Sequence, residues 1–241
     1  MSSSAQMIHD EHHRALVRRL AAELKPTRSM WPVSIRLALW MALEIGILMW
    51  VMTGSGRNVI GRLKEPAYAM EALFFGFAAV ILAALALRSA IPGRFLSTLE
   101  ATIAGLLVLA GTLLITASVP MDTARSVAEF VRVGLQCALR IGLYSALPLA
   151  ALWWMIVRGA SMQGGLSGLL AGGSAVFFAM TILRLECPNN EPLHILIWHL
   201  LPALALAVLS ALAGSRWLKF RSYVRRRRDA ANDRTQPITR Y

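Results

Sequence analysis

Cysteine is scarce in this chain, with only Cys137 and Cys187 among 241 residues. Two cysteines allow at most one disulfide, which excludes a small fold held together by a network of bridges. Charged residues are also few, at 16% of the chain, whereas 56% of the residues are hydrophobic and the mean hydropathy is +0.55. A soluble domain of this length has too little interior for so much apolar surface. The composition therefore predicts a membrane protein.

The chain also lacks the motifs of common enzyme classes. The P-loop G-x-x-x-x-G-K-[ST], the nucleophile elbow G-x-S-x-G and the zincin motif H-E-x-x-H are all absent. A membrane thiol oxidoreductase normally relays electrons through two cysteine pairs, and this chain has one pair at most. No inverted repeat typical of a transporter is evident. We expect no catalytic activity and no small-molecule substrate, with a small transporter and a thiol redox protein as the alternatives.

Long apolar segments predict an all-α protein with six transmembrane helices. Six segments approach or exceed the ~20 residues that cross a hydrocarbon core of ~30 Å. Ionisable side chains are rare at such depth, so Glu44 and Arg140 are expected to face the bundle interior or a cavity. A cytoplasmic segment, residues 1–34, precedes this domain (35–213), and a basic cytoplasmic tail, 214–241, follows it. The expected spans are 35–52, 67–87, 101–119, 133–157, 164–183 and 193–213.

Glycines gather in the fifth expected span. Small residues at helical spacing permit two helices to approach closely, so this pattern predicts a packing role for the segment. The residues concerned are Gly164, Gly165, Gly168, Gly172 and Gly173.

Lysine and arginine are distributed unevenly about the expected spans. The side that carries both termini has eighteen of them, and the opposite side has six. The positive-inside rule then places both termini in the cytoplasm, as in a bacterial inner-membrane protein. The net charge of +12 lies mainly at the chain ends. That position favours membrane orientation and lipid head-group contact over direct binding to nucleic acid.

The N-terminal segment contains no apolar stretch of the kind found in a cleavable signal peptide. Residues 8–25 instead predict an amphipathic helix, because Leu16, Leu20 and Leu24 recur every four residues among basic side chains. Two interpretations remain open. The helix lies on the anionic membrane surface, or it presents its leucine stripe to a groove on a partner protein.

The expected topology places both cysteines near the outer face of the membrane. Cys137 lies about 6 Å inside the start of the fourth span, at ~1.5 Å per residue, and Cys187 lies just beyond the end of the fifth. If those spans form an antiparallel hairpin, the two sulfurs meet at one height, where an oxidising periplasm would allow a bridge. The plainer alternative is a core residue and a loop residue with no shared role.

Histidines follow the second cysteine in the stretch E-C-P-N-N-E-P-L-H-I-L-I-W-H, residues 186–199. Thiol and imidazole side chains bind soft metals. Five residues turn an α-helix by about 140°, so His194 and His199 are not expected on one face. His194 is the better ligand candidate beside Cys137 and Cys187, and His199 the less favoured one. We expect no permanent cofactor and at most a transient soft metal ion.

The string C-P-x-x-x-x-L-H-x-x-x-W-H, which begins at Cys187, resembles the last-loop motif of the NrsF-type anti-sigma factors. The resemblance covers residues 15–218 and includes Lys25, Pro26 and Arg28, the turn at 91–93 and the cysteine of the fourth span. It implies a polytopic membrane protein that restrains a stress-responsive sigma factor of the extracytoplasmic-function class. It also implies that Cys137 and Cys187 respond to metal or oxidative stress. We assign sigma binding to Leu16, Leu20 and Leu24.

Overall fold

The computed structural model describes residues 31–54, 59–91, 93–117, 126–159, 161–187, 189 and 191–234, and its regular structure there is entirely helical. This confirms the expected all-α class. The expected helix at 8–25, with Leu16, Leu20 and Leu24, lies outside the described residues. The elements are α2 (Val33–Gly54), α3 (Val59–Leu63), α4 (Pro66–Ser89), α5 (Thr98–Ala117), α6 (Val127–Val157), α7 (Gly164–Glu186), α8 (Pro192–Ile195), a π-helical segment η1 (Leu196–Leu200) and α9 (Leu201–Arg234).

Five helical segments of the described chain are long and apolar enough to cross a membrane. They are α2, α4, α6, α7 and the stretch Pro192–Trp217 that runs from α8 into α9. The apolar part of α5, Thr98–Leu114, is shorter. The protein is therefore a multi-pass membrane protein, and the third of the six expected spans stays a prediction.

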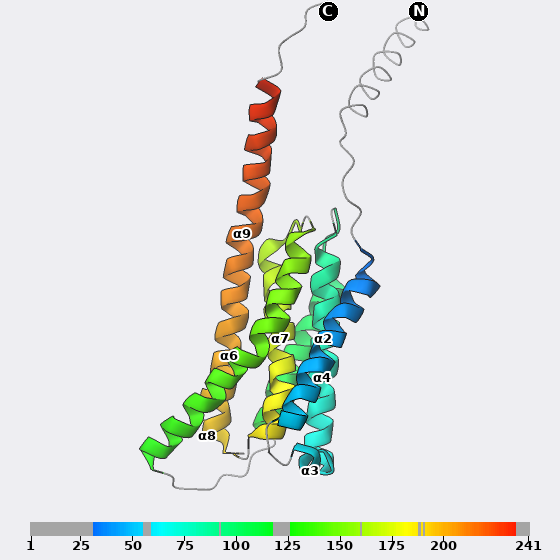
Figure 1. Ribbon diagram of the computed structural model, residues 1–241. Helices are drawn as coiled ribbons and strands as arrows, with labels where there is room; N and C mark the ends of the chain where they lie inside the picture. The colour runs from blue at the N-terminus through cyan, green and yellow to red at the C-terminus, as the bar shows by residue number, and fades with distance from the viewer. Residues whose placement is uncertain are drawn as a thin grey trace, which may run out of the picture. The chain divides into compact units, whose positions relative to one another are not determined.

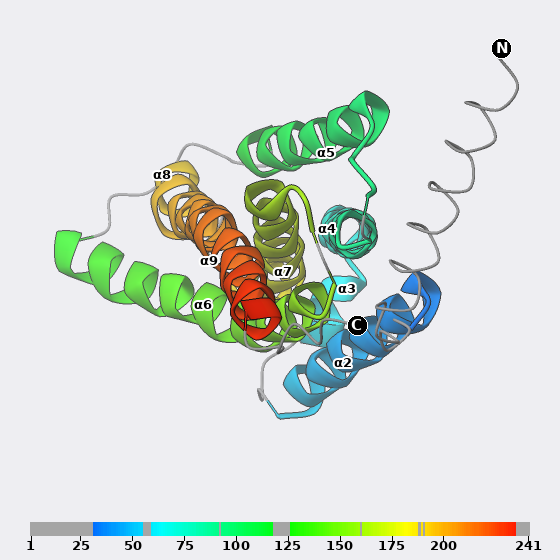
Figure 2. The same ribbon diagram turned by 90° about the horizontal axis from the view of Figure 1, so that it is seen from above.

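Helix α7 is the centre of the bundle. It packs against α4, α6 and α9, and the view from above shows it among its neighbours (Figure 2). In its apolar window, 83% of the residues are buried, compared with 22% in α2. The small residues of α7 allow the neighbouring helices to approach it closely.

The α7–α9 contact depends on glycines spaced four residues apart. A Cβ added at Gly168 would lie 2.2 Å from the carbonyl oxygen of Ser210, and one added at Gly214 would lie 2.2 Å from that of Gly164. The Ser210 hydroxyl in turn donates to the Gly168 carbonyl over 2.7 Å. The packing role expected from the glycine pattern is thus confirmed for Gly168, because no larger side chain fits between these backbones.

A buried ion pair joins α7 to α4. Arg184 Nε lies 2.5 Å from Glu71 Oε2, and both side chains are almost fully buried. The Arg184 guanidinium also lies 5.6 Å from the centre of the Tyr68 ring. A buried charge without a partner is costly, so each member of this pair makes the other tolerable.

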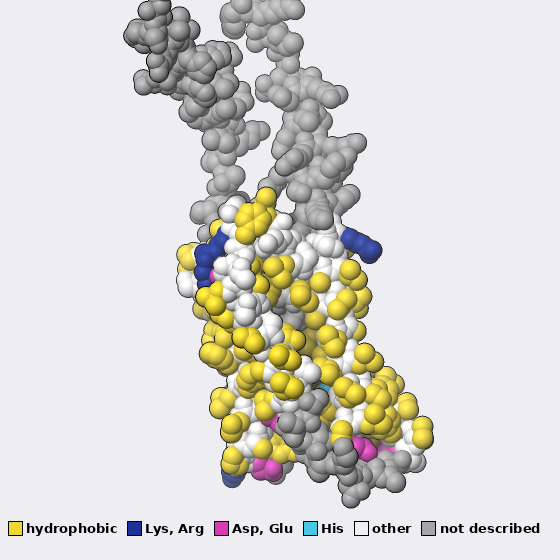
Figure 3. Space-filling model, turned by 180° about the vertical axis from the view of Figure 1, so that it is seen from behind, with side chains coloured by type: hydrophobic (Ala, Val, Ile, Leu, Met, Phe, Trp, Pro, Cys, Tyr) yellow, Lys and Arg dark blue, Asp and Glu magenta, His cyan; other side chains and the backbone are white. Residues whose placement is uncertain are grey.

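The outer surface of the bundle is apolar. Hydrophobic side chains cover most of the face seen in Figure 3, and charged ones lie near its two ends. Exposed large residues include Leu73, Phe77, Leu139 and Leu143, each of them more than half accessible. Exposed apolar surface of this extent matches a lipid environment.

Helix α6 begins at Val127, six residues before the expected start at 133. The expectation was wrong because Glu129 and Arg132 lower the local hydropathy, which made this stretch resemble a loop. The missed signal is a helix N-cap followed by an acidic residue: the Ser126 hydroxyl accepts a hydrogen bond from the Glu129 amide over 3.3 Å. Cys137 therefore lies about 15 Å along α6, at ~1.5 Å per residue, and not about 6 Å.

Helices α2 and α9 place the first and last described residues of the bundle at the same end (Figure 1). Helix α9 continues without a break from the apolar segment through residue 214 into the basic segment. The opposite end holds the start of α6, the end of α7 and the start of α8 (Figure 1). Cys187 follows α7 directly, so this opposite end also carries the candidate site.

Candidate functional site

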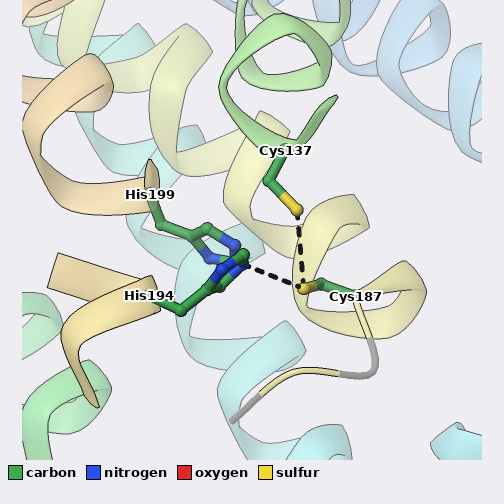
Figure 4. A group of neighbouring side chains, drawn as sticks. All are labelled: Cys137, Cys187, His194 and His199. Atoms are coloured by element: carbon green, nitrogen blue, oxygen red, sulfur yellow. Dashed lines mark hydrogen bonds between the residues drawn. The ribbon is translucent and has the colours of Figure 1, made fainter. Parts of the chain in front are cut away.

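Two thiols and two imidazoles meet at the end of the bundle where α7 stops. Cys137 comes from α6, Cys187 caps the C-terminus of α7, His194 belongs to α8 and His199 to η1. One donor atom of each lies within 4.8 Å of the corresponding atom of every other. All four side chains are buried, and Figure 4 shows Cys137 and both rings directed toward Cys187.

The two sulfurs lie close together without being bonded. Cys137 Sγ and Cys187 Sγ are 3.6 Å apart and are not joined by a disulfide. A disulfide requires about 2.05 Å, so the observed separation is that of two reduced thiols in contact. The expected meeting of the two cysteines is therefore observed, although Cys137 lies deeper along α6 than expected.

His199 joins the cluster because the helix changes its pitch. In η1 the Leu201 amide donates to the Leu196 carbonyl, five residues back. In an α-helix the bond would reach four residues back, and His194 and His199 would point about 140° apart. The π-turn brings their ring centroids to within 5.2 Å. The low rank given to His199 as a ligand rested on α-helical geometry, which this segment does not have.

Aromatic side chains enclose the two imidazoles. Phe130 on α6 meets the His194 ring edge-on at 6.2 Å between centroids and the Trp198 ring at 6.0 Å. Trp198 itself packs against Gly134, where an added Cβ would lie 2.2 Å from its indole. The absence of a side chain at Gly134 thus permits α6 to approach the π-turn.

The imidazoles have few hydrogen-bond partners among the described residues. His194 Nε2 lies 3.7 Å from Cys187 Sγ. His194 Nδ1 and both ring nitrogens of His199 are buried and have no hydrogen-bond partner within the described part of the chain. A buried polar atom without a partner costs free energy, so these nitrogens favour a ligand in the cluster.

The surroundings of Cys187 lower the pKa of its thiol. The neighbouring Cys137 thiol, as a hydrogen-bond donor, lowers the pKa of Cys187 most, and His194 and His199 act in the same direction. Burial opposes them by raising the pKa, and the net shift is downward. The thiolate is the form that binds metals and attacks oxidants.

A polar cavity of about 570 Å³ leads to the sulfurs. Both cysteines contribute to its wall, together with Arg62, Arg140 and Glu186. Both cysteines therefore border this cavity, although their side chains are buried.

Arg140 is not isolated in this wall. Its guanidinium lies 3.9 Å from Glu186, which also accepts a hydrogen bond of 2.8 Å from the Tyr144 hydroxyl. Arg62 on α3 donates to the backbone carbonyl of Cys187. Sequence reasoning missed Glu186, Tyr144 and Arg62, since their partners come from other helices. Only Tyr144 carried a local signal, seven residues or two helical turns after Cys137.

Glu44 lies outside this cluster, in α2. Its side chain is buried as expected, and its Oε1 has no hydrogen-bond partner within the described residues. The described structure therefore brings together Cys137, Cys187, His194 and His199 but does not include Glu44 among them.

The fold and the cluster define a multi-pass helical membrane protein with a buried thiol and imidazole site. The sequence profile of the NrsF family, described as negative regulator of sigma F, matches residues 20–220. The chain belongs to this family, which confirms the resemblance seen in the last-loop motif. Comparisons with curated proteins and with solved structures found no match. The family's role is negative regulation of a sigma factor, so a sigma factor is the partner.

The close approach of α6 to the π-turn yields a testable prediction. In Gly134→Ala the new methyl group collides with Trp198 and displaces the segment that holds His199. Overpacking costs about 1–3 kcal/mol, so labelling of the two cysteines by N-ethylmaleimide should accelerate at least about fivefold.

Gly142→Ala is the matched control on the same helix. A Cβ at Gly142 meets nothing within 4 Å, so its labelling rate should equal that of the wild type. Equal rates for both variants would contradict the packing role of Gly134.

Proposed function

We propose that this protein is an inner-membrane anti-sigma factor that holds an extracytoplasmic-function sigma factor on its cytoplasmic side. It releases the sigma factor when Cys137 and Cys187 react with a soft metal ion or an oxidant. The protein acts without catalysis, and its site serves as a sensor. The observation that carries this proposal is the pair of thiol sulfurs 3.6 Å apart beside two histidines.

The sulfur separation suits both kinds of signal. A two-electron oxidant such as hypochlorous acid converts the two thiols into one disulfide, with release of chloride, water and a proton. The sulfurs need approach by only about 1.5 Å to reach bonding distance. A soft metal ion instead bridges two thiolates without electron transfer. Either event ties α6 to the end of α7.

A signal on the outer side of the membrane must change the affinity of the protein for the sigma factor on the cytoplasmic side. Moving a two-state bundle from 1:99 to 99:1 requires about 5.5 kcal/mol of differential binding. Metal ions bound through thiolates supply about 10 kcal/mol or more in small structural sites. Because α7 packs against α4, α6 and α9, a shift at its end is transmitted to most of the bundle.

Two other functions fit the site less well. A transporter would use an intramembrane charge such as Arg140 along its path, but Arg140 lies opposite Glu186 in the wall of the sensor cavity. A thiol oxidoreductase would need a second cysteine pair to pass electrons onward, and the sequence has none. The net charge at the chain ends supports membrane orientation, with lipid as the contact and no direct binding to nucleic acid.

The proposed orientation predicts the outcome of reporter fusions. The excess of lysine and arginine on the side of the termini should place fusions at Ser4 and Tyr241 in the cytoplasm. A fusion at Pro192, beside the cysteine site, should give periplasmic activity in an alkaline phosphatase assay. Phosphatase activity at Ser4 or Tyr241 would overturn this orientation.

The leucine stripe predicts where the sigma factor binds. Leu16→Asp combined with Leu20→Asp should release it, because burying uncompensated carboxylates in an apolar groove costs several kcal/mol. Co-purification of the sigma factor with the membrane fraction measures this. Ala15→Asp with Ala22→Asp adds the same charge to the opposite face of the expected helix and should leave binding intact. If both pairs retain the sigma factor, the helix serves the membrane surface only.

Substitution of the cysteines should separate repression from induction. Cys137→Ser, Cys187→Ser and the double variant should still repress a sigma-dependent reporter but should no longer respond to cadmium, chromate or hypochlorite. Serine retains the size of cysteine but neither binds soft metals nor forms a disulfide. His194→Ala should weaken the metal response and spare the oxidant response. Full induction in the double variant would eliminate the thiol sensor.

A further inference from the structure

Two separations between the donor atoms already match those of a tetrahedral metal site. Zinc–sulfur bonds of about 2.3 Å and zinc–nitrogen bonds of about 2.05 Å place neighbouring ligand atoms ~3.8 Å apart for two sulfurs and ~3.6 Å for sulfur and nitrogen. The observed separations are 3.6 Å for Cys137 Sγ to Cys187 Sγ and 3.7 Å for Cys187 Sγ to His194 Nε2. The remaining pairs of donor atoms lie within 4.8 Å.

We propose that Cys137, Cys187, His194 and His199 form a closed site that holds a resident zinc ion in the resting protein. The zinc site itself follows from the geometry of the four ligands. Its role in sensing rests on the proposed function. In this site the metal ion is permanent and not transient as expected from the sequence, and His199 is one of its four ligands.

Charge balance favours this occupant. Two thiolates and two neutral imidazoles neutralise a divalent cation, so the complete site carries no net charge. Burying a neutral centre avoids the large desolvation cost of an isolated ion or thiolate. All four ligands are buried, with Cys187, His194 and His199 fully inaccessible, as in structural zinc sites that leave no open position.

The unpartnered imidazole nitrogens point the same way. Neither ring nitrogen of His199 has a hydrogen-bond partner within the described residues, although the ring is fully buried. Figure 4 shows that ring beside the His194 ring, which it meets edge-on at 5.2 Å between centroids, on the side that faces Cys187. A metal ion satisfies one nitrogen of each ring, and it also explains why a π-turn is retained at this position, since such turns concentrate at functional sites.

The full-length protein, purified in mild detergent without chelators, provides the test. Elemental analysis should find about one zinc ion per chain in the wild type. The zinc content should fall at least about tenfold in His199→Ala and in Cys137→Ser, because each removes a ligand. Leu196→Ala, which changes an exposed residue of the same π-turn, should retain the wild-type content.

A spectroscopic measurement covers the case in which a variant fails to fold. The wild type, stripped of zinc and titrated with Co²⁺, should show the intense visible bands of tetrahedral cobalt with thiolate charge transfer. His199→Cys should keep the metal and strengthen the charge-transfer band, because a third sulfur replaces a nitrogen. Octahedral cobalt in the wild type would overturn the proposal.

The outcomes distinguish this inference from the sensor function. A wild type free of zinc whose cysteine variants lose induction would overturn the resident ion and leave the thiol sensor standing. Stoichiometric zinc in a protein whose cysteine variants still respond would support the ion as a structural element and refute the sensor. Zinc that persists undiminished in His199→Ala would overturn the four-ligand assignment.

Discussion

The enclosure of α7 is the constraint on which the rest of the structure depends. Because α7 has neighbours along most of its length, its side chains must be small where other helices approach, and its glycines meet this requirement. The buried charge of Arg184 near its end must also be neutralised, and Glu71 does this. Because α7 is held in place by α4, α6 and α9, the residue that caps its C-terminus, Cys187, has a fixed position. A cysteine on a free loop would not define a site with ligands from three other segments.

The sequence predicted the class of the fold well because long apolar segments are a strong signal. It predicted the neighbourhood of Cys137 and Cys187 from an antiparallel hairpin, which requires only the direction of two helices. It did not predict the start of α6, since charged residues there hid a helix cap at Ser126. Nor did it predict the partners of Arg140 and Glu186, which depend on the packing of separate helices.

The position of His199 beside His194 was not predicted, and the physical cause is specific. Spacing of five residues is unfavourable for a shared face only while the helix keeps 3.6 residues per turn. A π-turn is stabilised by tertiary contacts, here the packing of Trp198 into the space left by Gly134, and no local pattern announces it. The motif contains Cys187, His194 and His199, but the π-turn and the helix packing that bring them together form only in the folded bundle.

The π-turn also sets the rotation of everything that follows it. One extra residue in a turn offsets the downstream helix by about 100° relative to an uninterrupted α-helix. Ser210 and Gly214, the small residues of α9 that meet α7, lie downstream of the turn, so the direction in which they face includes that offset. The histidine site therefore helps to set the rotation of α9 about its own axis. A change that converted the π-turn into an α-helical turn would rotate α9, including its basic segment.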